Sequence, residues 1–214
     1  MRKLLFVLLL FAFAVPCLRA QQPISRDIEI TPFGGARFGG QVQLNGSGFD
    51  DYRFKSSWNY GGILDVGLAP DLMPNLEGEF MWNRQDTELS AQYGGIGPYV
   101  DLTPATLDLY QFGLLYQFGP QQAKLHPFIV GGLGFTNFHT NGALPFDNKF
   151  AFNLGGGVKY FVTKHVGFRL EARYSPTQTT TSQAIYCGPY GCFGATVHNF
   201  AQQGQANAGV IIRF

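Results

Sequence analysis

The last ten residues of the chain alternate between two kinds of side chain, and this alternation constrains the fold more than any other feature. The residues of one parity are apolar, namely Ala208, Val210, Ile212 and Phe214. The residues between them are Asn207, Gly209, Ile211 and Arg213. Successive side chains of a β-strand point to opposite faces, so this segment is predicted to form a strand with one apolar face. An apolar face that ends in an aromatic residue suits contact with lipid, in a sheet whose last strand pairs with its first.

The same alternation recurs along the chain after residue 20, where no segment has helical periodicity. It predicts eight strands, at residues 27–40, 56–68, 75–89, 106–118, 124–140, 148–162, 166–175 and 198–214. The connections between them alternate in length. Long loops are predicted at 41–54, 90–104, 141–147 and 176–196, and short turns at 70–74, 119–122 and 163–165. This alternation is typical of a barrel that crosses a membrane, with short turns on one side and long loops on the other.

The predicted fold is therefore all-β, an eight-stranded antiparallel up-and-down transmembrane β-barrel. Aromatic residues share one parity and are expected to face lipid: Trp58, Tyr60, Phe80, Trp82, Tyr110, Phe112, Tyr116, Phe118, Phe150, Phe152, Tyr160, Phe168 and Tyr174. Charged residues of the other parity are expected inside the barrel: Asp65, Glu77, Glu79, Lys159, Arg169, Glu171 and Arg173. A soluble barrel with apolar residues inside is the competing architecture, and the parity of 124–140 stays ambiguous because its apolar residues and glycines fall on both faces.

Composition favours the membrane barrel. Charged residues make up 14% of the chain, against roughly 25% in ordinary soluble domains. The chain also contains 28 Gly and 21 Phe. A membrane barrel needs an apolar, aromatic outer band, which this composition supplies.

Residues 1–20 are predicted to be a signal peptide, and residues 21–214 the barrel domain. Arg2 and Lys3 precede an unbroken apolar run from Leu4 to Val15, and Ala20 is a small residue suited to cleavage. The run is too short to span a bilayer, which takes roughly 20 residues. Removing this segment takes away three cations and no acid, so the formal charge changes from +1 to −2. No basic run remains, so the sequence gives no support for a nucleic-acid partner.

The two cysteines after the signal peptide are expected to form a disulfide. Cys187 and Cys192 are separated by Gly188, Pro189, Tyr190 and Gly191. An exported protein meets an oxidising compartment, in which such a pair is oxidised. Two free thiols are the alternative.

Several segments resemble the outer membrane protein β-barrel domain family, which is similar to small eight-stranded barrels of the OmpA and OmpX type. The segments are Pro127–Gly134, Asn153–Phe161 and Gly167–Tyr174. The positions of Asn207, Gly209, Ile212 and Phe214 also resemble the signal that outer-membrane assembly machinery reads. The resemblance implies residence in the cell outer membrane, with membrane lipid and the assembly machinery as partners.

The sequence indicates little chemistry. The four histidines have no spacing typical of metal ligands, and no helix follows the Gly155–Gly157 cluster, so neither a metal nor a cofactor is expected. The function we expect is structural or adhesive, through four outer loops that bind an unidentified extracellular ligand. The alternative is a small-solute channel. A lipid A-modifying enzyme, with Ser175 or Ser182 beside His198, is a remote alternative, and the protein is not expected to be an enzyme.

Overall fold

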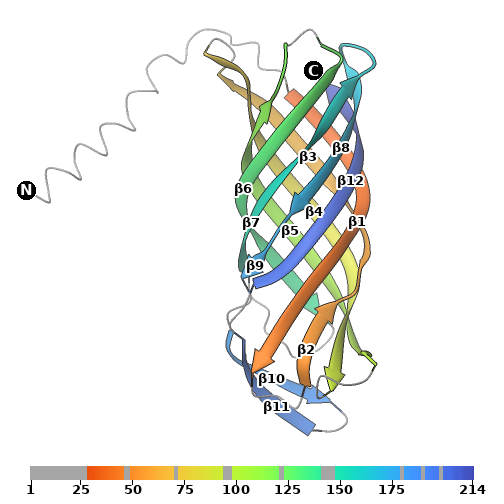
Figure 1. Cartoon of the computed structure of the whole chain (residues 1–214), viewed down its shortest axis with the longest axis vertical. Helices are drawn as coiled ribbons and strands as arrows, with labels where there is room; N and C mark the ends of the chain where they lie inside the picture. The colour runs from red at the N-terminus through yellow and green to blue at the C-terminus, as the bar shows by residue number, and fades with distance from the viewer. Residues whose placement is uncertain are drawn as a thin grey trace, which may run out of the picture.

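Eight strands form a closed antiparallel barrel in the computed structural model (Figure 1). The structure describes residues 28–45, 49–69, 72–93, 98–120, 123–140, 148–178, 181–188, 191–197 and 200–214. The barrel strands are β1 (Ile28–Asn45), β3 (Ser57–Ala69), β4 (Met73–Tyr93), β5 (Val100–Gln117), β6 (Leu125–Thr140), β7 (Lys149–Phe161), β8 (Val166–Tyr174) and β12 (Phe200–Arg213). Within these described ranges, no helix is long and apolar enough to cross a membrane.

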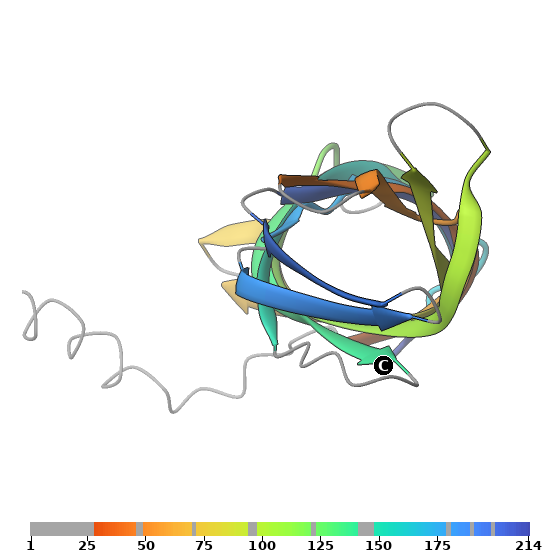
Figure 2. The ribbon, with the colours of Figure 1, turned by 90° about the horizontal axis from the view of Figure 1, so that it is seen from below.

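Pairing of the first and last strands closes the sheet. β1 pairs with β12 in a register that places Ile30 opposite Ile212 and Gly34 opposite Ala208, and on its other side β1 pairs with β3. Each remaining strand pairs with its neighbours in sequence, from β3 through to β12. Viewed along the axis, the strands form a complete ring (Figure 2). Closure leaves these strands without a free edge over the height of the barrel.

The barrel continues further at one end than the sequence predicted. The loop expected at 41–54 contains the end of β1 and a further strand, β2 (Phe49–Phe54), which pairs with both β1 and β4. The loop expected at 176–196 contains β9 (Thr177–Gln178), β10 (Thr181–Gly188) and β11 (Gly191–Val197). The expected loop at 90–104 is also shortened, because β4 reaches Tyr93 and β5 begins at Val100. Strands at this end were missed because they lack the apolar alternation of the other segments.

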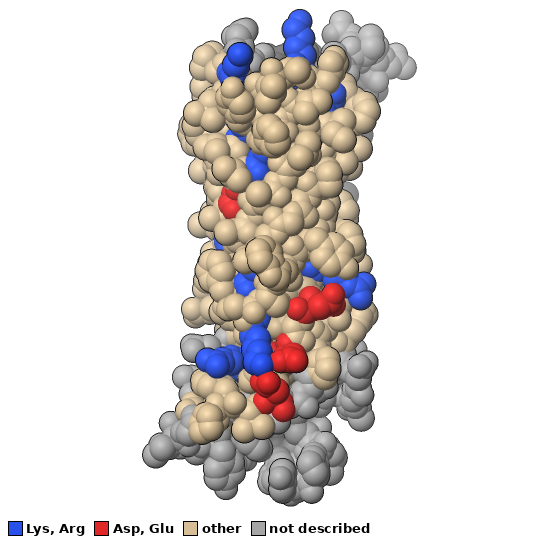
Figure 3. Space-filling model, turned by 90° about the vertical axis from the view of Figure 1, so that its right-hand side faces the viewer, with Lys and Arg blue, Asp and Glu red and all other residues tan. Residues whose placement is uncertain are grey.

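An apolar belt surrounds the outside of the barrel. All thirteen aromatic residues expected on this face point outward and are exposed or half-exposed, from Trp58 at 81% to the partly covered Trp82. On β5 and just after it, outward-facing residues are apolar from Tyr110 to Phe118, and Asp108 follows beyond Tyr110. Nine residues at ~3.3 Å each, tilted by about 40°, span about 23 Å, close to the ~25 Å belt of outer-membrane barrels. Figure 3 shows acidic and basic side chains gathered toward the lower end, Lys or Arg side chains at the upper end, and only small charged patches on the surface between them.

The interior of the barrel is mostly polar. Among the described residues, more than twenty polar or charged side chains are buried, including every charged residue that the sequence placed inside. Two small apolar clusters lie among them. One consists of Phe33, Ile63, Met81, Leu109 and Ala151, and the other of Leu115, Phe128 and Val130. A soluble barrel would bury the opposite parity, so this burial excludes it.

The second cluster resolves the parity of β6, which the sequence left ambiguous. Phe128 and Val130 are buried, whereas Ile129 and Leu133 are more than half exposed. Both faces of this strand carry apolar residues, because on the inner face Phe128 and Val130 pack on Leu115 and Phe128 also lies under Arg169 of β8. The guanidinium of Arg169 lies 4.6 Å from the centre of the Phe128 ring.

A glycine pair bends β1 where it leaves the belt. Gly39 and Gly40 have φ of 88° and 97°, a conformation that other residues rarely adopt. The register between β1 and β12 shifts at the same point, between Gly39 and Gln41. This irregularity is a β-bulge, and bulges commonly bend a strand at the rim of a barrel.

Candidate functional site

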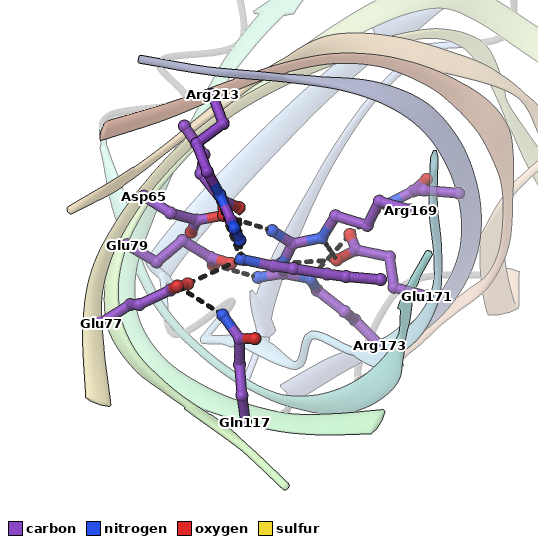
Figure 4. Close-up of polar contacts among 11 residues, drawn as sticks. Asp65, Glu77, Glu79, Gln117, Arg169, Glu171, Arg173 and Arg213 are labelled. Atoms are coloured by element: carbon purple, nitrogen blue, oxygen red, sulfur yellow. Dashed lines mark hydrogen bonds and ion pairs between the residues drawn. The ribbon is translucent and has the colours of Figure 1, made fainter. Parts of the chain in front are cut away.

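The charged residues inside the barrel come together in one network that crosses the lumen (Figure 4). Its acids come mainly from one wall, with Glu29 on β1, Asp65 on β3, and Glu77 and Glu79 on β4. Its cations come mainly from the opposite wall, on β7 and β8. Period-two alternation aims each of these side chains inward, and closure of the barrel brings the two walls face to face.

Lys159 is the centre of one half of the network. Its ammonium nitrogen donates hydrogen bonds to Glu29 Oε2 at 2.7 Å, Asp65 Oδ2 at 3.1 Å and Glu77 Oε2 at 2.6 Å. The side chains of Lys159 and Asp65 are both 0% exposed. Gln117 Nε2 donates to the other oxygen of Glu77. Three strands of one wall are thus tied to β7 through a single side chain.

The three acids around Lys159 have the arrangement of a metal site. One oxygen of each lies within 4.8 Å of the others. The ammonium of Lys159 lies within hydrogen-bond distance of all three, so the positive charge that a metal ion would bring is already supplied. The structure therefore gives no support for a metal ion at these carboxylates.

Two arginines on β8 form the other half. Arg173 donates from both terminal nitrogens to Glu79, at 2.6 and 2.8 Å, and from Nε to Glu171 at 2.9 Å. Arg169 donates to Asp65 at 2.7 Å, to Glu79 at 2.6 Å and to Glu171 at 2.8 Å. Such charge-assisted bonds are the strongest that side chains make, and the fork of a guanidinium fixes their geometry. Asp65 joins this half to the half centred on Lys159.

The network includes residues that the sequence did not assign to the barrel interior. Arg213 donates through Nε to Glu29 Oε1 at 2.8 Å, and its guanidinium lies 3.7 Å from the centre of the Phe161 ring. Asn207 Nδ2 donates to Glu171 Oε1 at 3.0 Å. The sequence could have placed Glu29 and Arg213 inside the barrel, because both have the inward parity on the first and last strands. Only the register of β1 with β12, which pairs Glu29 with Arg213, shows that they meet.

A chain of side-chain amides extends the network toward the other end of the barrel. Asn59 Nδ2 donates to Asn207 Oδ1 at 2.9 Å and to Asn83 Oδ1 at 3.2 Å. Asn83 Nδ2 donates to Gln205 Oε1 at 2.8 Å, and Arg37 donates to the same oxygen at 2.7 and 3.1 Å. These five residues are all buried. Hydrogen bonds therefore run continuously through the lumen from Glu171 to Arg37.

The arrangement brings opposite charges into contact across the lumen. Four cations (Lys159, Arg169, Arg173 and Arg213) meet five carboxylates (Glu29, Asp65, Glu77, Glu79 and Glu171), and all of these pairs are within 3.1 Å. Eight strands enclose an interior just wide enough for side chains to fill.

A second, exposed group of charges lies beyond the apolar belt. Lys55 donates to Glu88 at 2.8 Å and to Asp101 at 2.7 Å, and Ser90 Oγ donates to Asp101 at 2.9 Å. The hydrogen bonds to Asp101 and Glu88 raise the pKa of the Lys55 ammonium. The bonds from Lys55 and Ser90 lower the pKa of the Asp101 carboxyl. These ion pairs mark the part of the barrel wall that faces water.

The cysteines lie opposite each other in the β10–β11 hairpin. The register pairs Cys187 with Cys192 next to the pair Gly188 and Gly191, which flanks the turn. Directly opposed residues of antiparallel strands have Cα atoms about 4.5–5.5 Å apart, within the range that a disulfide needs. The side chains of this hairpin are outside the described set, so the disulfide stays a prediction.

Other predicted features fall partly outside the described residues. The predicted signal peptide, residues 1–20, and His198 lie outside them altogether. Ser175, the candidate nucleophile, is buried on the inner wall, and its hydroxyl has no hydrogen-bond partner. The histidine of the candidate deacylase set therefore lies outside the part of the chain that the structure describes. Of the residues predicted to form an assembly signal, Asn207 points into the network, whereas Ile212 and Phe214 are exposed on the outside.

A closed barrel with an aromatic belt outside and ionised groups inside is an integral membrane protein of the outer-membrane type. Comparison with known proteins gives the same class. Residues 5–214 match the family model described as the outer membrane protein beta-barrel domain. The chain belongs to this family, and it is a protein of the cell outer membrane. No curated protein matches the chain.

Solved structures share the fold at low sequence identity. The chain is similar to the outer membrane protein OprG from Pseudomonas aeruginosa, with 13% identity, a TM-score of 0.69, and coverage of 88% of this chain and 95% of that one. It is similar to a major outer membrane protein from Thermus thermophilus, with 12% identity, a TM-score of 0.54, and coverage of 87% and 99%. Neisserial surface protein A matches with 13% identity, a TM-score of 0.52, and coverage of 88% and 97%. At these identities the likeness shows the fold alone.

Proposed function

We propose that the protein is a non-conducting outer-membrane barrel that presents its outer end as a surface for interaction. The observation that carries the proposal is the network between the acids of β1, β3 and β4 and the cations of β7 and β8. A solute crossing the lumen would have to part buried ion pairs, each of which is costly to break. A barrel whose lumen is filled by side chains can serve as a rigid membrane anchor for the strands and connections at its outer end.

The outer end offers material for such a surface. β2 and the β10–β11 hairpin extend past the apolar belt, and the hairpin lies over one side of the ring (Figures 1 and 2). Exposed ion pairs, such as those of Lys55 with Glu88 and Asp101, lie on the barrel wall beyond the apolar belt. The ligand would be an extracellular molecule that binds these strands and the connections between them.

Conductance of the purified protein in planar bilayers tests the proposal. We expect no steady current steps from the wild-type barrel. The double substitution Arg169→Ala and Arg173→Ala removes two guanidinium groups from the lumen, and we expect it to produce or increase conductance. Substitution of Lys124, an exposed residue at a turn, to alanine is the control and should leave the bilayer silent. Regular steps from the wild-type protein would instead establish the alternative, a small-solute channel.

We also propose that Cys187 and Cys192 form a disulfide that holds the outer hairpin together. Their opposed register in the β10–β11 hairpin supports this, and an exported protein meets an oxidising compartment. Maleimide labelling of the native protein should be low before reduction and high after it. The single substitution Cys192→Ser should expose Cys187 to labelling without reduction. Equal labelling of the wild-type protein before and after reduction would show two free thiols.

A further inference from the structure

Arg37 differs from the other lumenal cations in having no acidic partner. Its guanidinium is buried, at 1% exposure, and donates only to the amide oxygen of Gln205, through Nε and Nη2. No carboxylate among the described residues lies within 4.0 Å of it, and its Nη1 has no hydrogen-bond partner. A buried charge is costly unless it is paired, so this guanidinium is a candidate for binding an anion.

β12, which pairs with β1, and the end of β8, which pairs with β12, supply two further unsatisfied donors. Gln203 Nε2 on β12 is a buried donor without a partner, and so is the hydroxyl of Ser175, which follows β8. The two are neighbours, because the Ser175 backbone N–H donates to the Gln203 carbonyl oxygen at 2.8 Å. Gln203 is paired with Gly39, two residues beyond Arg37 on the same face. Inward-facing residues in this diagonal relation have Cα atoms about 7–8 Å apart.

The bulge at Gly39 and Gly40 lies directly beside these donors. A Cβ atom at Gly40 would come within 3.1 Å of Gln203 Nε2 and within 3.1 Å of the Phe54 ring. A side chain at this position would therefore press on the amide donor. Glycine at this position leaves the Gln203 amide donor unobstructed, and bulges of this kind are frequent next to functional sites.

We propose that Arg37, Gln203 and Ser175 form a binding site for a small oxyanion, a carboxylate or phosphate group, in the outer half of the lumen. The guanidinium supplies the charge, while the amide and the hydroxyl supply additional donors, a combination suited to oxyanions. Unsatisfied acceptors, Asn59 Oδ1 and Gln85 Oε1, lie on the other side of Arg37, on β3 and β4. They suit water or a hydroxyl group, so the anionic group binds on the side of β8, β12 and β1.

The ion-pair network lies on the side of this site that faces away from the outer end of the barrel. Acids of the network are already engaged by Lys159, Arg169 and Arg173, so none of them neutralises Arg37. The belt ends near Arg84, a charged and partly exposed residue of β4 that pairs with Asp108 on β5. An anion would therefore reach Arg37 from the outer end and stop at the network. The site goes beyond the anchoring function and does not depend on it.

Anion binding to the purified protein in nanodiscs tests the site directly. Phosphorus-31 resonances of inorganic phosphate and carbon-13 resonances of labelled acetate are followed as protein is added, in separate experiments. We expect saturable broadening for at least one probe, and the probe that responds identifies the oxyanion. No saturable response to either probe would overturn the proposal and would mean that water satisfies these donors.

Matched variants assign the response to the three residues. Arg37→Met should weaken binding on the order of tenfold to a hundredfold, the usual effect of losing a charged hydrogen-bond partner. Arg37→Lys should retain part of the binding. Arg84→Met removes the same charge from the outer face of the barrel and should bind like the wild type. Binding by Arg37→Met at wild-type strength would refute the assignment.

A second pair of variants covers a failure of Arg37→Met to fold, which heat-modifiable gel migration reveals. Gln203→Glu replaces a donor by a negative charge and should abolish binding. Ser175→Ala removes only a hydroxyl and should weaken binding severalfold. Full binding by a folded Gln203→Glu variant would contradict the site independently of Arg37.

Discussion

Replacing Lys159 by methionine should lower the free energy of unfolding by about 3–5 kcal/mol, the usual cost of leaving buried charges without their partner. The ammonium lies 2.6, 2.7 and 3.1 Å from three carboxylates, and its own side chain is 0% exposed. Methionine preserves most of the volume but leaves three acids with oxygens within 4.8 Å of one another. At about 1.4 kcal/mol for each factor of ten, the folding equilibrium constant would fall roughly a hundredfold to several thousandfold.

Urea unfolding of the barrel in lipid vesicles measures this loss. Fluorescence of Trp58 and Trp82, which both lie on the outer face, reports transfer from lipid to water. A shift of the midpoint with an unchanged slope gives the difference in stability. The control is Lys124→Met, the same substitution at an exposed turn, for which we expect a change within about 0.5 kcal/mol.

A second substitution separates the charge effect from packing. Among the described residues, Glu77 forms side-chain hydrogen bonds with Lys159 and Gln117, so Glu77→Gln removes one acid with few other consequences. Added to Lys159→Met, it should recover part of the lost stability, because fewer like charges remain unpaired. A loss from Lys159→Met of less than about 1 kcal/mol, or no recovery in the double variant, would show that the network does not stabilise the barrel.

Other predictions follow from single positions. Gly61→Ala should reduce the heat-resistant folded fraction on gels, because its Cβ would lie 2.0 Å from a backbone oxygen of the adjacent strand, whereas Gly62→Ala, with nothing within 4 Å, should behave as wild type. The Asp101 pKa is lowered by Lys55, so any stability from this pair is present at neutral pH and is lost as pH falls through that lowered value. In Lys55→Ala the NMR titration midpoint of Asp101 should rise, and an unchanged midpoint would exclude the interaction. Deletion of Phe214 should lower the yield of assembled barrel in membranes; an undiminished yield would count against the proposed assembly signal.

Much of the fold could be predicted from local pattern. Within the belt, one face of each strand meets lipid and the other meets the side chains in the lumen. Apolar and polar residues therefore alternate with a period of two, and this alternation is visible in the sequence. Beyond the belt both faces of a strand can meet water, so β2 and the β10–β11 hairpin carry no such signal. The sequence left the parity of β6 ambiguous for a different reason. Phe128 is an inward-facing apolar residue that packs under Arg169, so apolar residues lie on both faces of this strand.

The sequence by itself determined which side chains share a face, because parity depends only on position along a strand. It could not determine which of them meet. The contacts of Lys159 with Glu29 and Asp65 join residues 130 and 94 positions apart, and they exist only because the sheet closes with one particular register. The tertiary structure alone decided that the acids face the cations across the lumen, and that Arg37, at the edge of the same network, is left without an acid.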